Sequence, residues 1–130
     1  MIHRVLENKV LSMIGNGKAI LIMGARQVGK STLLETLFRE RENVLWLTGD
    51  DIDVQELFRE ITSSRLKNLL GNSKMIIIDE AQRIQDIGLR LKIITDQMKD
   101  VQVIATGSSS FELASKLNES LTGRKREFRM

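Results

Sequence analysis

The sequence contains no cysteine and no proline, one histidine and one tryptophan among its 130 residues. The lack of cysteine excludes a disulfide scaffold, a thiolate nucleophile and zinc bound by cysteine. The single histidine, His3, argues against a histidine-ligated metal site and a serine–histidine–aspartate triad. No apolar run approaches the ~20 residues that span a bilayer, and the N-terminus lacks the apolar stretch of a signal peptide. We therefore expect a cytoplasmic protein without a membrane segment, whose chemistry uses carboxylates, lysine, arginine, hydroxyls or backbone groups.

The net charge of the chain is concentrated at its C-terminal end. Lysine and arginine number 20 and aspartate and glutamate 17, which gives a net charge of +3. Residues 124–130 alone carry four basic side chains and one acidic one, so the rest of the chain has no net charge. The bulk charge therefore gives little support to nucleic-acid binding. With 42% hydrophobic residues, the chain can bury a core. Its 130 residues are enough for one domain and too few for two, so we expect a single domain over 1–130.

Short apolar runs alternate with helical patterns along the chain. The predicted strands cover 19–23, 44–48, 75–78 and 101–105, with a fifth just beginning at 127–130. The predicted helices cover 3–14, 31–41, two stretches between 52 and 70, 84–98 and 109–117. Continuous apolar strands are typical of a sheet that is covered on both faces. The order therefore predicts an α/β fold with a parallel sheet, in which ligands bind at the carboxyl ends of the strands.

A glycine-rich segment follows the first predicted strand: Gly24-Ala25-Arg26-Gln27-Val28-Gly29-Lys30-Ser31-Thr32. It fits the phosphate-loop pattern G-x-x-x-x-G-K-[ST], and it stands between a strand and a helix as that loop requires. Its glycines let backbone N–H groups surround a β-phosphate, and the following helix directs its positive end to the same anion. Lys30 would reach the β- and γ-phosphates, and the Ser31 hydroxyl would bind Mg²⁺. Arg26 would contact phosphate or brace the loop.

Two carboxylates, Asp79 and Glu80, follow the apolar run 75–78. In a phosphate-loop protein the first would hold Mg²⁺ together with Ser31. The second would take a proton from the water that attacks the γ-phosphate. The alternative is that the two acids begin a helix, whose dipole favours negative charge there. The phosphate loop upstream favours the first interpretation, and the sequence has no Asn-Lys-x-Asp motif for reading guanine.

The segments GARQVGKSTLL, IIIDEAQ and TGSSSF, followed by SLTGR, resemble the prokaryotic AAA-type ATPases. The resemblance runs from about Gly24 to Arg124. It implies a P-loop NTPase three-layer sandwich, with a sheet of about five strands in the order 5-1-4-3-2 and ATP as substrate. In that family the ATPase domain is usually the N-terminal part of a longer protein. We therefore expect 1–130 to be an N-terminal fragment with an incomplete fifth strand, and a protein or DNA partner to bind through the C-terminal region.

The same resemblance implies roles at two further places. Thr106 or Ser108 lies where AAA-type ATPases carry sensor 1, a polar residue that contacts the attacking water or the γ-phosphate. Arg124 corresponds to the family's Gly-Arg, and its guanidinium would offset transition-state charge in cis or from a neighbouring subunit. The alternatives are a serine that caps the next helix and a solvated basic tail.

Three aspartates and the tryptophan are lesser candidates. Asp50, Asp51 and Asp53 follow the second predicted strand, where they would bind magnesium or cap the following helix, and capping is the preferred interpretation. Trp46 is predicted to be buried packing within that strand.

The sequence thus predicts Mg²⁺-dependent ATP hydrolysis, with Glu80 as the base and with Lys30 and Arg124 as cations. The alternative is a non-hydrolysing ATP-binding switch that orders a DNA or protein surface. Glu80 distinguishes the two, because a pure binding module has no need of a general base. The oligomeric state stays open.

Overall fold

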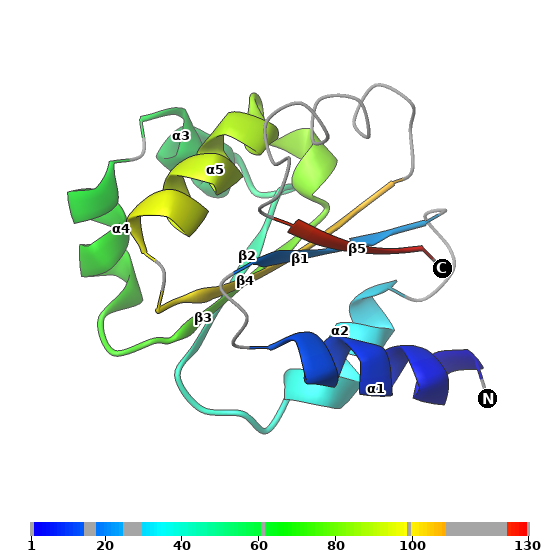
Figure 1. The fold of residues 1–130 in the computed structure, drawn as a ribbon. Helices are drawn as coiled ribbons and strands as arrows, with labels where there is room; N and C mark the ends of the chain where they lie inside the picture. The colour runs from blue at the N-terminus through cyan, green and yellow to red at the C-terminus, as the bar shows by residue number, and fades with distance from the viewer. Residues whose placement is uncertain are drawn as a thin grey trace.

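In the computed structural model, five parallel strands form one sheet in the order β2-β3-β4-β1-β5 (Figure 1). The strands are β1 (Ala19–Met23), β2 (Val44–Thr48), β3 (Met75–Asp79), β4 (Gln102–Gly107) and β5 (Lys125–Arg129). This confirms the α/β class and the predicted order 5-1-4-3-2. The structure describes residues 2–14, 18–24, 30–60, 62–98, 100–108 and 125–129, so the helix predicted at 109–117 lies outside the described residues.

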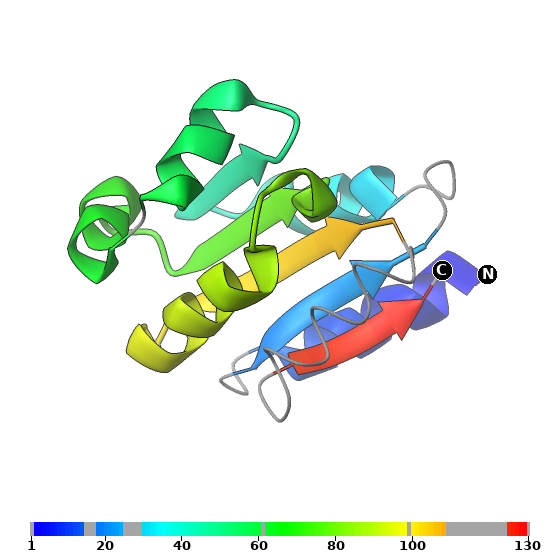
Figure 2. The same ribbon diagram turned by 90° about the horizontal axis from the view of Figure 1, so that it is seen from above.

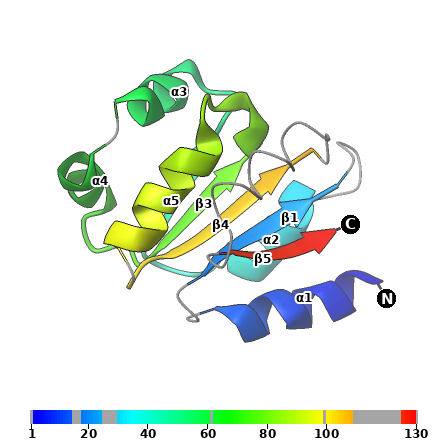
Figure 3. The ribbon, with the colours of Figure 1, turned by 45° about the horizontal axis from the view of Figure 1, so that its top comes forward.

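Helices cover both faces of the sheet, as the continuous apolar strands require (Figures 2 and 3). They are α1 (Ile2–Met13), α2 (Lys30–Phe38), α3 (Ile52–Arg59), α4 (Ser63–Leu70), the 3₁₀ helix η1 (Ala81–Arg83) and α5 (Ile87–Gln97). Side chains of α1 and α2 pack on one face, and side chains of α3, α4 and α5 pack on the other. None of the helices in the described part of the chain has the length and apolar character of a membrane span.

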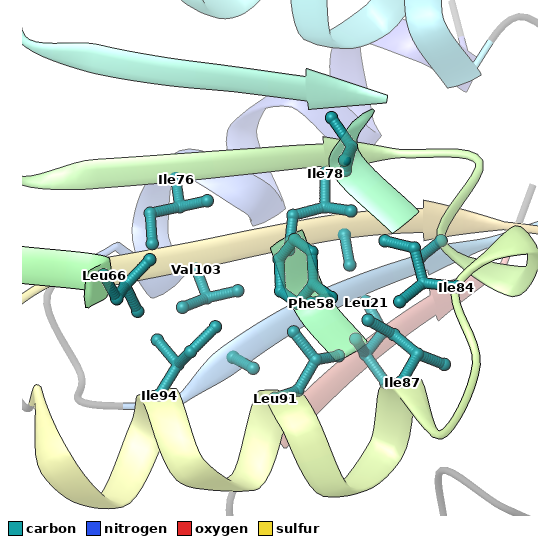
Figure 4. Packing of buried hydrophobic residues seen from close by; sticks show 14 of the residues in the cluster. Leu21, Phe58, Leu66, Ile76, Ile78, Ile84, Ile87, Leu91, Ile94 and Val103 are labelled. Atoms are coloured by element: carbon teal, nitrogen blue, oxygen red, sulfur yellow. The ribbon is translucent and has the colours of Figure 1, made fainter. Parts of the chain in front are cut away.

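The core divides into two clusters because successive strand residues point to opposite faces. In β1, Leu21 points to the cluster under α3, α4 and α5, and Ile20 and Ile22 point to the cluster under α1 and α2. Figure 4 shows the first cluster, where Phe58 and Leu91 lie between their helices and the sheet. Full burial of each such side chain stabilises the fold by about 1.5–3 kcal/mol. These contacts fix the strands whose carboxyl ends form the candidate site.

The apolar residues predicted to line one helix over 84–98 are all buried, which confirms them as core: Ile84, Ile87, Leu91, Ile94 and Met98. The helix itself begins later than predicted, because α5 starts at Ile87. Ile84 precedes it, just after η1, and reaches the same cluster from this connection. Spacing alone does not distinguish a buried residue before a helix from one within it.

The fifth strand is present and pairs with β1 at the edge of the sheet. All five residues of β5 pair with β1, from Ala19 with Lys125 to Met23 with Arg129. The strand begins two residues earlier than the sequence pattern predicts. Its first residues are charged, and charged residues are common on edge strands, which an apolar pattern therefore does not detect.

Candidate active site

The carboxyl ends of β1, β2, β3 and β4 meet at one edge of the sheet. The register pairs Thr48 with Asp79 and Met23 with Gly107. The N–H of Gly24 donates to the carbonyl oxygen of Gly107 at 3.2 Å. The segment predicted to bind phosphate therefore leaves β1 directly beside the end of β4.

The structure describes the first residue of the predicted phosphate loop, Gly24, and its last three, residues 30–32. Residues 25–29 lie outside the described residues, as does Arg124, and Lys30 and Ser31 are described as the first residues of α2. Thr32 is exposed on α2, and its carbonyl oxygen accepts the hydroxyl of Thr36 at 2.9 Å. Because Leu33 and Leu34 pack against the sheet, the first turn of α2 is anchored to the strands.

Asp79 is half-buried at the end of β3, beside Thr106 of β4. The Thr106 hydroxyl donates to Asp79 Oδ1. The N–H of Glu80 lies 3.1 Å from the same oxygen and 3.2 Å from Thr106 Oγ1. Because side chains alternate along a strand, Asp79 shares the face of Ile77, which α2 covers. The structure therefore brings Asp79, Glu80 and Thr106 together, as expected for residues at the carboxyl ends of parallel strands.

The chain turns sharply at Glu80, whose φ of 52° and ψ of 46° are left-handed. This conformation costs a non-glycine residue about 1–3 kcal/mol, so neighbouring groups must hold it. The Glu80 carbonyl accepts the N–H of Arg83 at 3.1 Å, and the Asp79 carbonyl accepts the N–H of Gly49 at 2.7 Å. A Cβ atom at residue 49 would overlap the Glu80 carbonyl, so the end of β2 needs glycine for this close approach.

The Glu80 side chain is bound by Gln82 and makes no hydrogen bond that caps η1. Gln82 Nε2 donates to Glu80 Oε2 at 2.6 Å, and Gln82 Oε1 accepts the backbone N–H of Ser108 at 3.3 Å. The two acids do stand directly before a helix, η1, and the role of Glu80 as a general base stays a prediction. The sequence analysis gave no role to Gln82, although this residue belongs to the segment IIIDEAQ. It gave no role to Gly49 either.

Thr106 and Ser108, the two sensor candidates, occupy different positions. Thr106 is 1% exposed, and its hydroxyl donates a hydrogen bond to Asp79. Ser108 is half-buried, and its backbone N–H contacts Gln82. Thr106 therefore touches the acid expected to hold magnesium, and Ser108 is linked to the acid expected to act as base. Which hydroxyl meets the γ-phosphate stays a prediction.

Two of the three aspartates after β2 have structural partners. The Asp51 carboxylate accepts the N–H of Asp53 at 2.8 Å and caps α3, which confirms the preferred interpretation. Asp50 forms an exposed ion pair with Arg83 at 3.5 Å.

The prediction that Trp46 is buried is wrong. Trp46 is 43% exposed, because it lies on β2, an edge strand of the sheet. With Leu34, Glu35 and Asp79 it lines a pocket of about 180 Å³. The sole tryptophan therefore lies close to the candidate site and not within the core.

A family model described as "AAA domain" matches residues 16–130. The chain belongs to this AAA domain family. The uncharacterized protein Rv2008c of Mycobacterium tuberculosis is 31% identical over 106 residues, which are 81% of this chain and 23% of that protein. The uncharacterized protein Mb2031c of Mycobacterium bovis gives the same values. The chain thus spans less than a quarter of the length of these relatives.

Solved structures show the same fold at low sequence identity. A chain of Drosophila ORC bound to DNA matches with a TM-score of 0.61 and 13% identity, over 98% of this chain and 88% of that one. Pif1 helicase from Candida albicans gives a TM-score of 0.59 and 14% identity, over 98% and 39% of the two chains. PCH-2 of C. elegans gives 0.54 and 16%, over 98% and 38%. The likeness to these proteins is one of fold.

The donor set at the carboxyl edge of the AAA domain fits Mg²⁺, which prefers a few carboxylate or hydroxyl oxygens together with phosphate oxygens. Asp79 supplies a carboxylate on the face covered by α2. Ser31 is the second residue of that helix and supplies a hydroxyl in the sequence. These two residues are the ones that would hold the ion.

Proposed function

We propose that this AAA domain binds ATP with Mg²⁺ through residues 24–32 and hydrolyses the β–γ phosphate bond. The observation that carries the proposal is the position of Glu80. A left-handed turn places this acid next to Asp79 at the edge where the phosphate loop leaves β1. Membership of the AAA domain family supports nucleotide binding in general.

Binding depends on positive groups that face the triphosphate. The Lys30 ammonium pairs with the β- and γ-phosphates, and the N-terminal end of α2 adds backbone N–H donors. Asp79 and Ser31 hold Mg²⁺, which when bound offsets charge on the phosphate oxygens. Because the Thr106 hydroxyl donates to one oxygen of Asp79, it fixes the rotation of that carboxylate.

The chemical step uses Glu80 as the general base. Its carboxylate takes one proton from a water molecule as the water oxygen forms a bond to the γ-phosphorus. The bond between the γ-phosphorus and the bridging oxygen breaks, and ADP leaves with that electron pair. Lys30 and Arg124 offset the developing charge, and Thr106 or Ser108 contacts the water or the γ-phosphate as sensor.

Arg124 is proposed to serve the ATP of a neighbouring subunit. The next residue, Lys125, pairs with Ala19 at the amino end of β1. Gly24, where the predicted phosphate loop begins, is five residues further along, or about 16 Å at ~3.3 Å per residue. The position of Lys125 therefore favours a role for Arg124 at a site outside its own chain.

The partner of the ATP cycle is proposed to bind outside this domain, as a protein or DNA. Residues 1–123 have no net charge and offer no bulk positive charge to DNA. The curated relatives are more than four times as long as the matched segment, which is 23% of their length. The additional part of such a chain has room for the partner site.

Phosphate release by wild type and Glu80→Gln tests the proposal, with Glu40→Gln as a matched exposed control. We expect Glu80→Gln to keep its affinity for ATP while hydrolysis falls ~10²-fold or more, the scale of a lost general base. The control should behave as wild type. Equal hydrolysis by wild type and Glu80→Gln would contradict the role of Glu80. Tight binding by wild type without phosphate release would instead support the non-hydrolysing switch.

A further inference from the structure

The side chain of Gln82 joins the carboxylate of Glu80 to the end of β4. Its amide nitrogen donates to Glu80 Oε2 at 2.6 Å, and its amide oxygen accepts the N–H of Ser108 at 3.3 Å. A primary amide carries donor and acceptor on one planar group, so both bonds together restrict its orientation. The bond to Glu80 has an ionised acceptor, which makes it stronger than a bond between neutral groups.

The backbone that carries Gln82 is itself held in place. Gln82 is the middle residue of η1, whose turn is closed by the bonds from Arg83 N–H to the Glu80 carbonyl and from Ile84 N–H to the Ala81 carbonyl. Ala81 and Ile84 are 5% and 3% exposed and belong to the core cluster under α5. The Gln82 amide therefore projects from a packed element and not from a free loop.

The Glu80 backbone is fixed by Asp79, Thr106 and Gly49, but these contacts leave the carboxylate free to rotate. A general base must hold its oxygen within hydrogen-bond reach of the attacking water. A misplacement of about 1 Å can cost ~10²-fold in rate. Among the described residues, the hydrogen bond from Gln82 holds this carboxylate in position.

We propose that Gln82 is a positioning residue, which orients the Glu80 carboxylate and ties it to the carboxyl end of β4 through Ser108. The inference rests on the proposed role of Glu80 as the general base. Gln82 touches neither substrate nor metal in this account, so its removal affects the chemical step and leaves ATP binding unchanged.

The test is steady-state and single-turnover ATP hydrolysis by Gln82→Met, which keeps the length of the side chain and removes both polar atoms. We expect kcat to fall ~10- to 100-fold, with KM and the Kd for ATP within about twofold of wild type. Gln85→Met makes the same chemical change at an exposed residue nearby and should leave kcat, KM and Kd unchanged. A wild-type kcat in Gln82→Met, or a fall in ATP affinity equal to the fall in rate, would overturn the inference.

A double-mutant cycle separates positioning from a general structural effect. In a Glu80→Gln background the change Gln82→Met should alter the residual rate less than about twofold, because the group it orients is no longer a base. An equal fall in both backgrounds would overturn the inference.

If Gln82→Met does not fold, Gln82→Glu has the same shape and keeps the acceptor for Ser108. It replaces the donor to Glu80 with a like charge and should also lower kcat, and a wild-type rate would overturn the inference. Failure of the proposed function is distinguishable from failure of this inference. If Glu80 is not the base, the single variant Glu80→Gln hydrolyses ATP as wild type does.

Discussion

Thr106 uses one hydroxyl to hold two residues of the site. It donates to the Asp79 carboxylate and accepts the N–H of Glu80 at 3.2 Å. With the residue 1% exposed, solvent cannot supply a substitute partner. The positions of both acids therefore depend on a side chain from the neighbouring strand.

Replacement of Thr106 by valine keeps the shape and removes this hydroxyl. The Asp79 carboxylate loses a donor and the Glu80 N–H loses one of its two acceptors. We expect the free energy of unfolding to fall by about 1–3 kcal/mol and ATP hydrolysis to fall as well. Urea unfolding and phosphate release measure the two effects.

Thr95→Val is the matched control, because Thr95 is also buried and its hydroxyl donates to the Lys92 carbonyl at 3.0 Å in α5. It should leave hydrolysis unchanged. Wild-type stability and turnover in Thr106→Val would show that this hydroxyl is not an anchor of the site.

At the scale of elements, the end of β2 supports the turn that follows β3. The N–H of Gly49 donates to the Asp79 carbonyl at 2.7 Å, and the Glu80 carbonyl occupies the space where a Cβ of residue 49 would lie. The left-handed turn at Glu80 thus depends on close backbone approach between two adjacent strands.

Gly49→Ala should disturb this turn. The Cβ would push against backbone and not against a flexible side chain, so strand ends must shift, at a cost of about 1–3 kcal/mol. We expect lower stability in urea unfolding together with slower phosphate release.

Gly71→Ala is the control for Gly49→Ala. Gly71 ends α4 with φ of 56° and has open space around its Cβ position. Alanine there should cost about 1–3 kcal/mol through backbone strain alone and leave hydrolysis unchanged. A silent Gly49→Ala, in stability and in rate, would contradict the account of the turn.

The elements that were predictable from sequence are those that depend on local patterns. The boundaries of β1 and β2 and the cap of α3 by Asp51 are confirmed. The beginning of α5, the first two residues of β5 and the exposure of Trp46 depend on which neighbour covers each segment. A one-dimensional pattern does not contain that information.

The candidate site divides in the same way. Asp79, Glu80 and Thr106 were predictable as a group because parallel strands bring their carboxyl ends to one edge. Gly49 and Gln82 were not, because their roles arise from contacts between β2 and β3 and between η1 and β4. The residues proposed to carry chemistry have a sequence signature, whereas those that hold them in place are recognised only in three dimensions.

At the scale of the whole molecule, the all-parallel sheet has two chemically different ends. The predicted phosphate loop follows β1 at the carboxyl end, whereas β5 begins at the amino end, where Lys125 pairs with Ala19. The first residue of β5 and the segment predicted to bind phosphate thus lie at opposite ends of the sheet.

Mixing two inactive variants tests whether Arg124 acts on a neighbouring subunit. Arg124→Ala should slow hydrolysis by ~10³-fold, the scale of a lost arginine finger, and Glu80→Gln is inactive for a different reason. An equal mixture should recover activity above the sum of the two, because Glu80→Gln subunits supply the arginine to intact Glu80 sites. A mixture without recovery would place the arginine in cis, and wild-type turnover by Arg124→Ala would assign it to the solvated tail.

Calorimetric titration of Mg·ATP into wild type and Lys30→Ala tests directly whether residues 24–32 bind ATP with Mg²⁺. Lys67→Ala, which removes an exposed lysine of α4, is the matched control. We predict saturable binding by wild type and by the control, and at least tenfold weaker binding by Lys30→Ala, about 1.4 kcal/mol or more. Equal affinities of all three proteins for Mg·ATP would contradict the account.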